Sequence, residues 1–170
     1  AAEPTQATAP GQLTIDELKG LYRYDVIGSQ TELFGVIADP VGHSLSPVIH
    51  NACFARFGMN KLYLPLWVQG GQAEFDAFME NVLTRPWLGF RGFSVTIPHK
   101  HNALMFVKAS GGTVEPLAEK IGAVNTLLIG ADGAVQAYNT DYAGALKAIT
   151  DALGGSALKG LPVAVIGAGG

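Results

Sequence analysis

Short apolar runs alternate with amphipathic stretches along most of the chain. Apolar runs bounded by glycine, proline and polar residues are typical of buried strands, whereas apolar residues spaced three and four apart indicate helices. The runs predict strands over 33–38, 62–68, 90–97, 123–130 and 134–140. The amphipathic stretches predict a short helix after Thr14 and helices from Ser46 to about Gly58, over 72–83, from Pro98, and over 141–153.

This alternation predicts an α/β fold, a three-layer αβα sandwich with a mainly parallel sheet, because strands joined through helices run parallel and are covered on both faces. Ala131-Asp132-Gly133 separates the last two predicted strands. Asp-Gly suits a tight reversal, so we expect a hairpin there and with it one antiparallel strand. Residues 1–12 are rich in Ala, Thr, Pro and Gln and are predicted to be a flexible tail or linker.

Composition narrows the function classes. The 170 residues are 48% hydrophobic and 15% charged, which is typical of a globular protein. The net charge of −3 argues against a basic surface that binds nucleic acid or an anionic membrane. Cys53 is the only cysteine, so no intrachain disulfide forms, and its apolar surroundings predict a buried, inert thiol. With no apolar span, secretory signal or zinc-type cluster, we expect a cytoplasmic protein with no bound metal.

Several polar residues follow the predicted strands. In a sheet of this kind ligands bind outside the carboxyl ends of the strands, so these positions are candidates for a site. The candidates are Ser44, Ser46, Thr96, Lys100, Asn125 and Asp141.

Ser44 and Ser46 precede a predicted helix. Two hydroxyls at a helix amino end can bind one carboxylate, which the helix dipole also attracts. Alternatively, Ser46 caps the helix that continues with Pro47, and Ser44 is an ordinary loop residue. The motif alone favours capping, although the two roles are compatible.

Lys100 and Asp141 are candidates for acid–base chemistry. Lys100 falls in a first helical turn, where the helix dipole disfavours a positive charge, and this suits its amine to proton transfer. The alternatives are a solvated surface lysine and an aspartate that caps its own helix. Together the two can move a proton to or from a secondary alcohol, and the Asn125 amide suits vicinal hydroxyls. His99 and His101 are interpreted as packing or surface residues.

The chain ends with an apolar run followed by Gly167-Ala168-Gly169-Gly170. A strand entering a glycine-rich turn begins a dinucleotide fingerprint, so residues 158–170 are predicted to start a truncated Rossmann domain. The segment does not distinguish NADP from NAD.

Residues 33–170 resemble the shikimate dehydrogenase family through the ordered motifs SLSP, GFSVTIPHK, GAVNT, NTD and GAGG. The resemblance implies reversible, NADPH-dependent reduction of 3-dehydroshikimate to shikimate in aromatic amino-acid biosynthesis. It implies a substrate-binding catalytic domain over 13–157 and an NADP-binding start over 158–170. It further implies that Ser44 and Ser46 hold the substrate carboxylate, Thr96 contacts substrate, Asn125 binds ring hydroxyls, Lys100 and Asp141 form the catalytic pair, and Gly167, Ala168, Gly169 and Gly170 contact NADP.

Residues 13–40 also resemble the junction in bifunctional proteins that join a 3-dehydroquinate dehydratase to this dehydrogenase. The alternatives are a quinate/shikimate dehydrogenase and a module that binds a hydroxy acid without turnover. We expect the isolated 170-residue chain to fold and to lack dehydrogenase activity, because most of the cofactor domain is missing. Its carboxy-terminal segment is a candidate for self-association.

Overall fold

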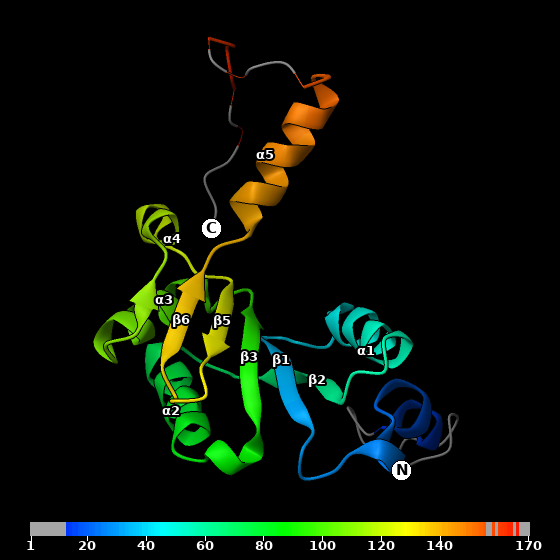
Figure 1. Ribbon diagram of the computed structural model, residues 1–170. Coiled ribbons are helices and arrows are strands. Elements are labelled where there is room, and N and C mark those ends of the chain that lie inside the picture. Colours follow the sequence, from blue (N-terminus) through cyan, green and yellow to red (C-terminus); the bar gives the residue numbers. More distant parts are fainter. Residues whose placement is uncertain (1–12, 156–157, 159, 165, 167–170) are drawn as a thin grey trace.

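The computed structural model describes residues 13–155, 158, 160–164 and 166 (Figure 1). Its strands are β1 Glu32–Ala38, β2 Lys61–Trp67, β3 Phe90–Val95, β4 Thr113–Val114, β5 Thr126–Ile129 and β6 Val135–Tyr138. Its α-helices are α1 Ser46–Arg56, α2 Gln72–Leu83, α3 Lys100–Ala109, α4 Pro116–Ile121 and α5 Asp141–Ala152. Single turns of other helix types are η1 Glu17–Leu21, η2 Tyr24–Val26 and η3 Pro86–Leu88.

The strands form one six-stranded sheet in the order β2-β1-β3-β5-β6-β4. Strand β1 is parallel to β2 and β3, and β4 is parallel to β6. Strand β5 is antiparallel to both β3 and β6. The mainly parallel sheet with one antiparallel strand is therefore confirmed, as is the hairpin, in which Gly133 adopts φ 82°.

Helices cover both faces of the sheet. On one face, Phe75 and Met79 of α2 and Val107 of α3 are fully buried in the main hydrophobic core, which includes Ile37 of β1. Because side chains alternate along a strand, Phe34 points to the opposite face, where its ring lies 5.9 Å from that of Phe54 in α1. The three-layer arrangement is confirmed.

Helix α1 is fixed to the edge strand β2 by Asn51. The buried Asn51 Nδ2 donates to the Tyr63 carbonyl oxygen at 2.8 Å, and the Tyr63 N–H donates to Asn51 Oδ1 at 2.8 Å. The His50 ring also stacks on the Tyr63 ring, with centroids 4.3 Å apart. These contacts fix the position of the residues that precede and begin α1.

Some local predictions were wrong. The periodicity gave no signal for β4 and α4, because a two-residue strand and a six-residue helix are too short for one. Helix α3 begins at Lys100 rather than at Pro98, because residues 97–99 form a turn in which the His99 N–H donates to the Thr96 carbonyl at 2.9 Å. Cys53 is exposed rather than buried, because it lies on a face of α1 where its neighbours Ile49 and Phe57 are exposed as well.

Helix α5 extends away from the sheet beyond the end of β6 (Figure 1), and none of its residues is buried. The predicted tail over 1–12 lies outside the described residues. The predicted start of a Rossmann domain over 158–170 is only partly described, and its described residues belong to no strand. The division of the chain at 12 and 157 stays a prediction.

Candidate active site

A pocket of about 270 Å³ lies at the edge of the sheet where β1, β3 and β6 end. Because β5 runs opposite to these strands, its amino end reaches the same edge and brings Asn125 there. The pocket brings together all six residues predicted from the sequence. Its lining consists of Val36, Ser44, Ser46, Ser94, Val95, Thr96, Lys100, Asn125, Thr126, Thr140 and Asp141.

The two serines line the pocket at the amino end of α1. The helix begins at Ser46, and the Ser46 N–H donates to Ser44 Oγ at 3.3 Å. Ser46 is thus the first helical residue, Leu45 occupies the N-cap position without a side-chain cap, and the capping role considered for Ser46 is wrong. Both hydroxyls lie where the partial positive charge of the helix amino end favours an anion.

Lys100 and Asp141 form an ion pair in the pocket. The Lys100 Nζ donates to Asp141 Oδ2 at 2.6 Å, with 25% and 57% of the two side chains exposed. This hydrogen bond is the main cause that lowers the pKa of Asp141, helped by a hydrogen bond from Asn125 and by the charge of Lys100, while partial burial acts in the opposite direction. Lys100 is thus not a solvated surface lysine, and Asp141 is not the cap of α5, whose preceding residue is Thr140.

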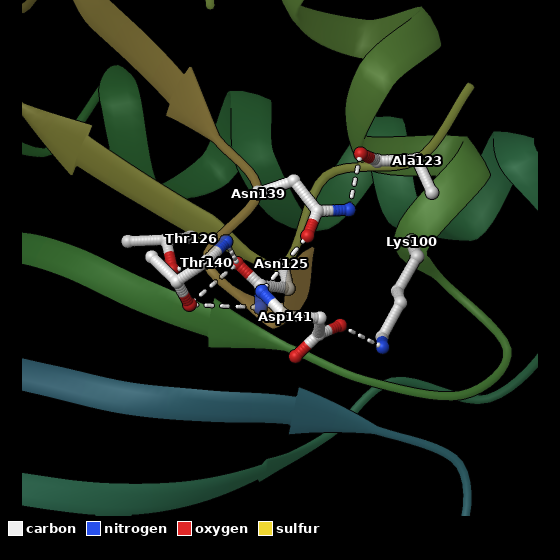
Figure 2. A network of polar contacts seen from close by, with 7 residues as sticks. All are labelled: Lys100, Ala123, Asn125, Thr126, Asn139, Thr140 and Asp141. Carbon is white, nitrogen blue, oxygen red and sulfur yellow. Dashed lines mark hydrogen bonds and ion pairs between the residues drawn. The ribbon is translucent and has the colours of Figure 1, made fainter. Parts of the chain in front are cut away.

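The Asn125 amide is held by its neighbours (Figure 2). Its Oδ1 accepts from the Thr140 N–H at 3.0 Å and from Thr126 Oγ1 at 2.8 Å. Its Nδ2 lies 3.0 Å from Thr140 Oγ1. The amide is therefore oriented before any ligand binds, so less side-chain entropy is lost when a ligand contacts it.

Sequence reasoning missed three polar residues of the pocket, Ser94, Thr126 and Thr140. Ser94 had a signal, because in a strand it shares a face with Thr96 two residues later. Thr126 and Thr140 adjoin the predicted residues Asn125 and Asp141 and had no signal beyond that adjacency.

Tyr63 was also missed, and its β2 position gave no functional signal. Its hydroxyl is buried without a hydrogen-bond partner among the described residues. Burial raises the pKa of the Tyr63 phenol, and the nearby hydroxyls of Ser94 and Ser46 oppose this effect. The phenol therefore lies next to the pocket hydroxyls.

The histidines take no part in the pocket. His99 is fully buried, with Nε2 2.6 Å from the Val68 carbonyl oxygen and Nδ1 3.0 Å from Asn102 Nδ2. Because a carbonyl only accepts, the proton is assigned to Nε2, and His99 is a packing residue as predicted. His101 is exposed, with Nδ1 3.3 Å from the Gly122 carbonyl oxygen.

The predicted cofactor residues Gly167, Ala168, Gly169 and Gly170 lie outside the described residues. Within the described part of the chain, no three His, Cys, Asp or Glu side chains gather closely enough to hold a metal ion. No helix of that part has the length and apolar character needed to cross a membrane.

Curated relatives cover most of this chain. A bifunctional 3-dehydroquinate dehydratase/shikimate dehydrogenase from Arabidopsis thaliana is 39% identical over 180 residues, 99% of this chain and 28% of that protein. A shikimate dehydrogenase (NADP(+)) from Methanosarcina mazei is 43% identical over 141 residues, 82% of this chain and 46% of that protein. The chain thus spans less than half the length of these relatives. The Arabidopsis protein is described as chloroplastic, so the cytoplasmic location stays a prediction.

Solved structures resemble the fold as well. Shikimate dehydrogenase from Aquifex aeolicus superposes with a TM-score of 0.63 at 37% identity, over 74% of this chain and 43% of that one. The enzyme from Thermus thermophilus, in complex with NADP(H) and shikimate, gives a TM-score of 0.59 at 32% identity, over 72% of this chain and 42% of that one. The family model described as the shikimate dehydrogenase substrate binding domain matches residues 36–127, more than half of the chain. The chain belongs to the family of shikimate dehydrogenase substrate-binding domains.

Proposed function

We propose that this chain is the substrate-binding and proton-transferring part of an NADP-dependent shikimate dehydrogenase, which reversibly reduces 3-dehydroshikimate to shikimate in aromatic amino-acid biosynthesis. The observation that carries the proposal is the Lys100–Asp141 pair, 2.6 Å apart, in a pocket whose other polar side chains carry hydroxyl and amide groups. Such a lining suits a small polyhydroxylated acid, because hydroxyls both donate and accept hydrogen bonds.

The substrate carboxylate is assigned to Ser44 and Ser46. Two hydroxyl donors at the amino end of α1 complement a negative charge, and each charge-assisted hydrogen bond contributes about 1.5–3 kcal/mol. Thr96 is assigned to a further substrate contact. Asn125 is assigned to the ring hydroxyls, because its amide is oriented by Thr126 and Thr140.

Transfer of the proton to and from the substrate oxygen is assigned to Lys100. During reduction the Lys100 ammonium gives a proton to the carbonyl oxygen that becomes the new hydroxyl, and in the reverse direction the neutral amine takes that proton back. Asp141 accepts a hydrogen bond from Lys100 Nζ, which orients the amine, and its other oxygen is suited to a substrate hydroxyl. When bound, NADPH supplies the hydride. Its assignment to Gly167, Ala168, Gly169 and Gly170 rests on the family motif and on the NADP(+) relatives.

Substrate binding can be tested on the chain itself. Backbone amide NMR shifts are followed while shikimate is added to the wild type and to a Ser44→Ala/Ser46→Ala variant, because this method detects weak binding. We expect shifts that centre on the pocket in the wild type and at least about tenfold weaker binding in the variant. A matched Ser110→Ala variant, changed at the far end of α3, should bind as the wild type does. Equal affinity in all three proteins contradicts the carboxylate assignment.

Turnover is tested in the complete dehydrogenase. Lys100→Ala should lower kcat by about 10²–10⁴-fold with a much smaller effect on KM, since proton transfer contributes in this range. Asp141→Asn should affect both parameters, because the carboxylate is assigned to substrate and to Lys100. Near-normal turnover of Lys100→Ala removes Lys100 from the mechanism, whereas binding without any wild-type turnover favours the binding module. Comparison of quinate with shikimate as substrate distinguishes the two dehydrogenase classes.

We also propose the predicted domain division, with a linker over 1–12, a substrate-binding catalytic domain over 13–157 and the start of an NADP-binding domain over 158–170. Leu161, Val163 and Ile166 are exposed in the last segment. Exposed apolar side chains favour burial against another surface, which supports self-association of the isolated chain. Sedimentation of the chain and of Val163→Asp tests this, because the variant should shift any dimer to monomer.

A further inference from the structure

Asn139 connects two loops of the pocket without lining it. Its side chain is buried, with 4% of the residue exposed. Its Nδ2 donates to the Ala123 carbonyl oxygen at 2.9 Å, and its Oδ1 accepts from the Asp141 N–H at 3.0 Å (Figure 2). Both ends of the amide are thus bonded to backbone atoms, one in each loop. Asn139 therefore differs from Asn125, whose amide faces the pocket.

The loop on the Ala123 side leads directly to Lys100. The Val124 N–H donates to the Lys100 carbonyl oxygen at 2.9 Å. Gly122, with φ 78°, ends α4 and directs the chain into this loop, which continues to Asn125. Hydrogen bonds and adjacent peptide units therefore join the backbone of Lys100, through Ala123 and Asn139, to the backbone of Asp141.

Glu115 binds the backbone of Asn139. The Asn139 N–H donates to Glu115 Oε2 at 3.2 Å, and the Tyr142 hydroxyl lies 3.5 Å from Glu115 Oε1. Glu115 itself is fixed, since its N–H donates to the Ala137 carbonyl at 2.9 Å. Residues on both sides of Asp141, Asn139 and Tyr142, thus contact Glu115, so the position of Asn139 is defined by the fold and not by Lys100.

The ion pair alone does not fix its own geometry. Both side chains are partly exposed, and a flexible lysine that pairs with an exposed carboxylate adopts several arrangements. A defined geometry therefore has to come from the backbones that carry the two side chains. Asn139 is a buried side chain that ties these backbones together, beside the bond that Asn125 Oδ1 accepts from the Thr140 N–H.

We propose that Asn139 is a positioning residue that holds Asp141 against Lys100 for the proton transfer by bridging the Ala123 carbonyl and the Asp141 N–H. This rests on the proposed function for its catalytic consequence, but the bridge itself can be tested on the chain without turnover. In the Asn139→Ala variant both bonds are lost. In Asn139→Ser the hydroxyl can still accept from the Asp141 N–H, as serine does in turns, but it cannot reach Ala123.

The first experiment measures the titration of the Asp141 carboxyl carbon by NMR. The hydrogen bond from Lys100 is the main cause that lowers the Asp141 pKa, so a loosened pair should titrate at a higher pH. We expect the midpoint to rise in both Asn139→Ala and Asn139→Ser, and to stay at the wild-type value in Asn81→Ala, an exposed asparagine of α2. An unchanged midpoint in a folded Asn139→Ala, or a wild-type midpoint in Asn139→Ser, overturns the bridge. Should Asn139→Ala not fold, Asn139→Ser decides.

The second experiment measures turnover in the complete dehydrogenase. Both Asn139 variants should lower kcat about 10- to 100-fold, as expected for misplacement of a reacting group, with KM within about threefold because Asn139 lines no part of the pocket. Unchanged kcat, or a loss confined to KM, overturns the positioning role. Failure of the proposed function would appear differently, as a wild-type enzyme that does not turn over shikimate, while the titration result would still support the bridge.

Discussion

Replacing Asn51 by alanine should destabilise the fold far more than an average substitution. The change removes both hydrogen bonds between α1 and the Tyr63 backbone. Each buried polar group left without a partner costs about 1–3 kcal/mol, so the Tyr63 N–H and C=O together give about 2–6 kcal/mol. Because β2 is an edge strand, water can reach these groups once the side chain is gone. We therefore expect a loss in the lower half of that range, about 2–4 kcal/mol.

Urea unfolding of the chain, followed by circular dichroism, measures this loss as a change in the free energy of unfolding. The matched control is Asn81→Ala on the exposed face of α2, where the same atoms are removed and the amide bonds only the Ala77 carbonyl and Arg85. Its effect should stay within about 0.5 kcal/mol. If Asn51→Ala costs no more than Asn81→Ala at an unchanged urea dependence, the two hydrogen bonds do not stabilise the fold in the way argued.

Two further predictions concern the sheet and the ion pair. Gly92→Ala should lower the free energy of unfolding by about 1–3 kcal/mol, because the new Cβ would lie 2.7 Å from the Leu127 carbonyl oxygen. Gly144→Ala, with open space around the new Cβ in α5, should be neutral or stabilising. Urea unfolding of the two variants compares these effects. The lowered pKa of Asp141 implies a stability contribution that is present above its unfolded-state pKa and is lost as pH falls through the lowered value. The pH dependence of unfolding for the wild type and Lys100→Met should therefore differ near neutral pH and converge in acid, and parallel curves would contradict this.

The longer helices and strands could be predicted because each contains enough apolar residues to show a helix or strand period. Helix α2 spans Gln72–Leu83 as expected, and its apolar side chains Phe75, Met79 and Val82 are buried. The candidate site could also be predicted, since strand ends and residue types together point to one edge of the sheet. The choice between capping and binding at Ser46 and Asp141 could not be made from the sequence, because only the structure shows that Leu45 and Thr140 occupy the N-cap positions of α1 and α5.

The supporting contacts could not be predicted, because they depend on backbone groups far away in the sequence. Asn139 bonds the carbonyl of Ala123, 16 residues earlier, and Asn51 bonds the backbone of Tyr63, 12 residues later. A sequence indicates that a side chain is polar, but it does not indicate which peptide groups the fold leaves without a partner. The sequence around these two asparagines contains no pattern that would distinguish them from surface residues.

The contact between Asn51 and β2 also protects the outer edge of the sheet. In a parallel pair, alternate residues direct their N–H and C=O toward the neighbouring strand, so if Tyr63 faces outward, Lys61, Pro65 and Trp67 face outward as well. Pro65 has no N–H, and the Tyr63 groups are already bonded to a side chain. A strand from another molecule would thus find no free N–H at two consecutive outward positions, 63 and 65. Edge-to-edge aggregation of native sheets should therefore be disfavoured at β2 in the folded chain, and Asn51 is a residue whose loss would remove part of that protection.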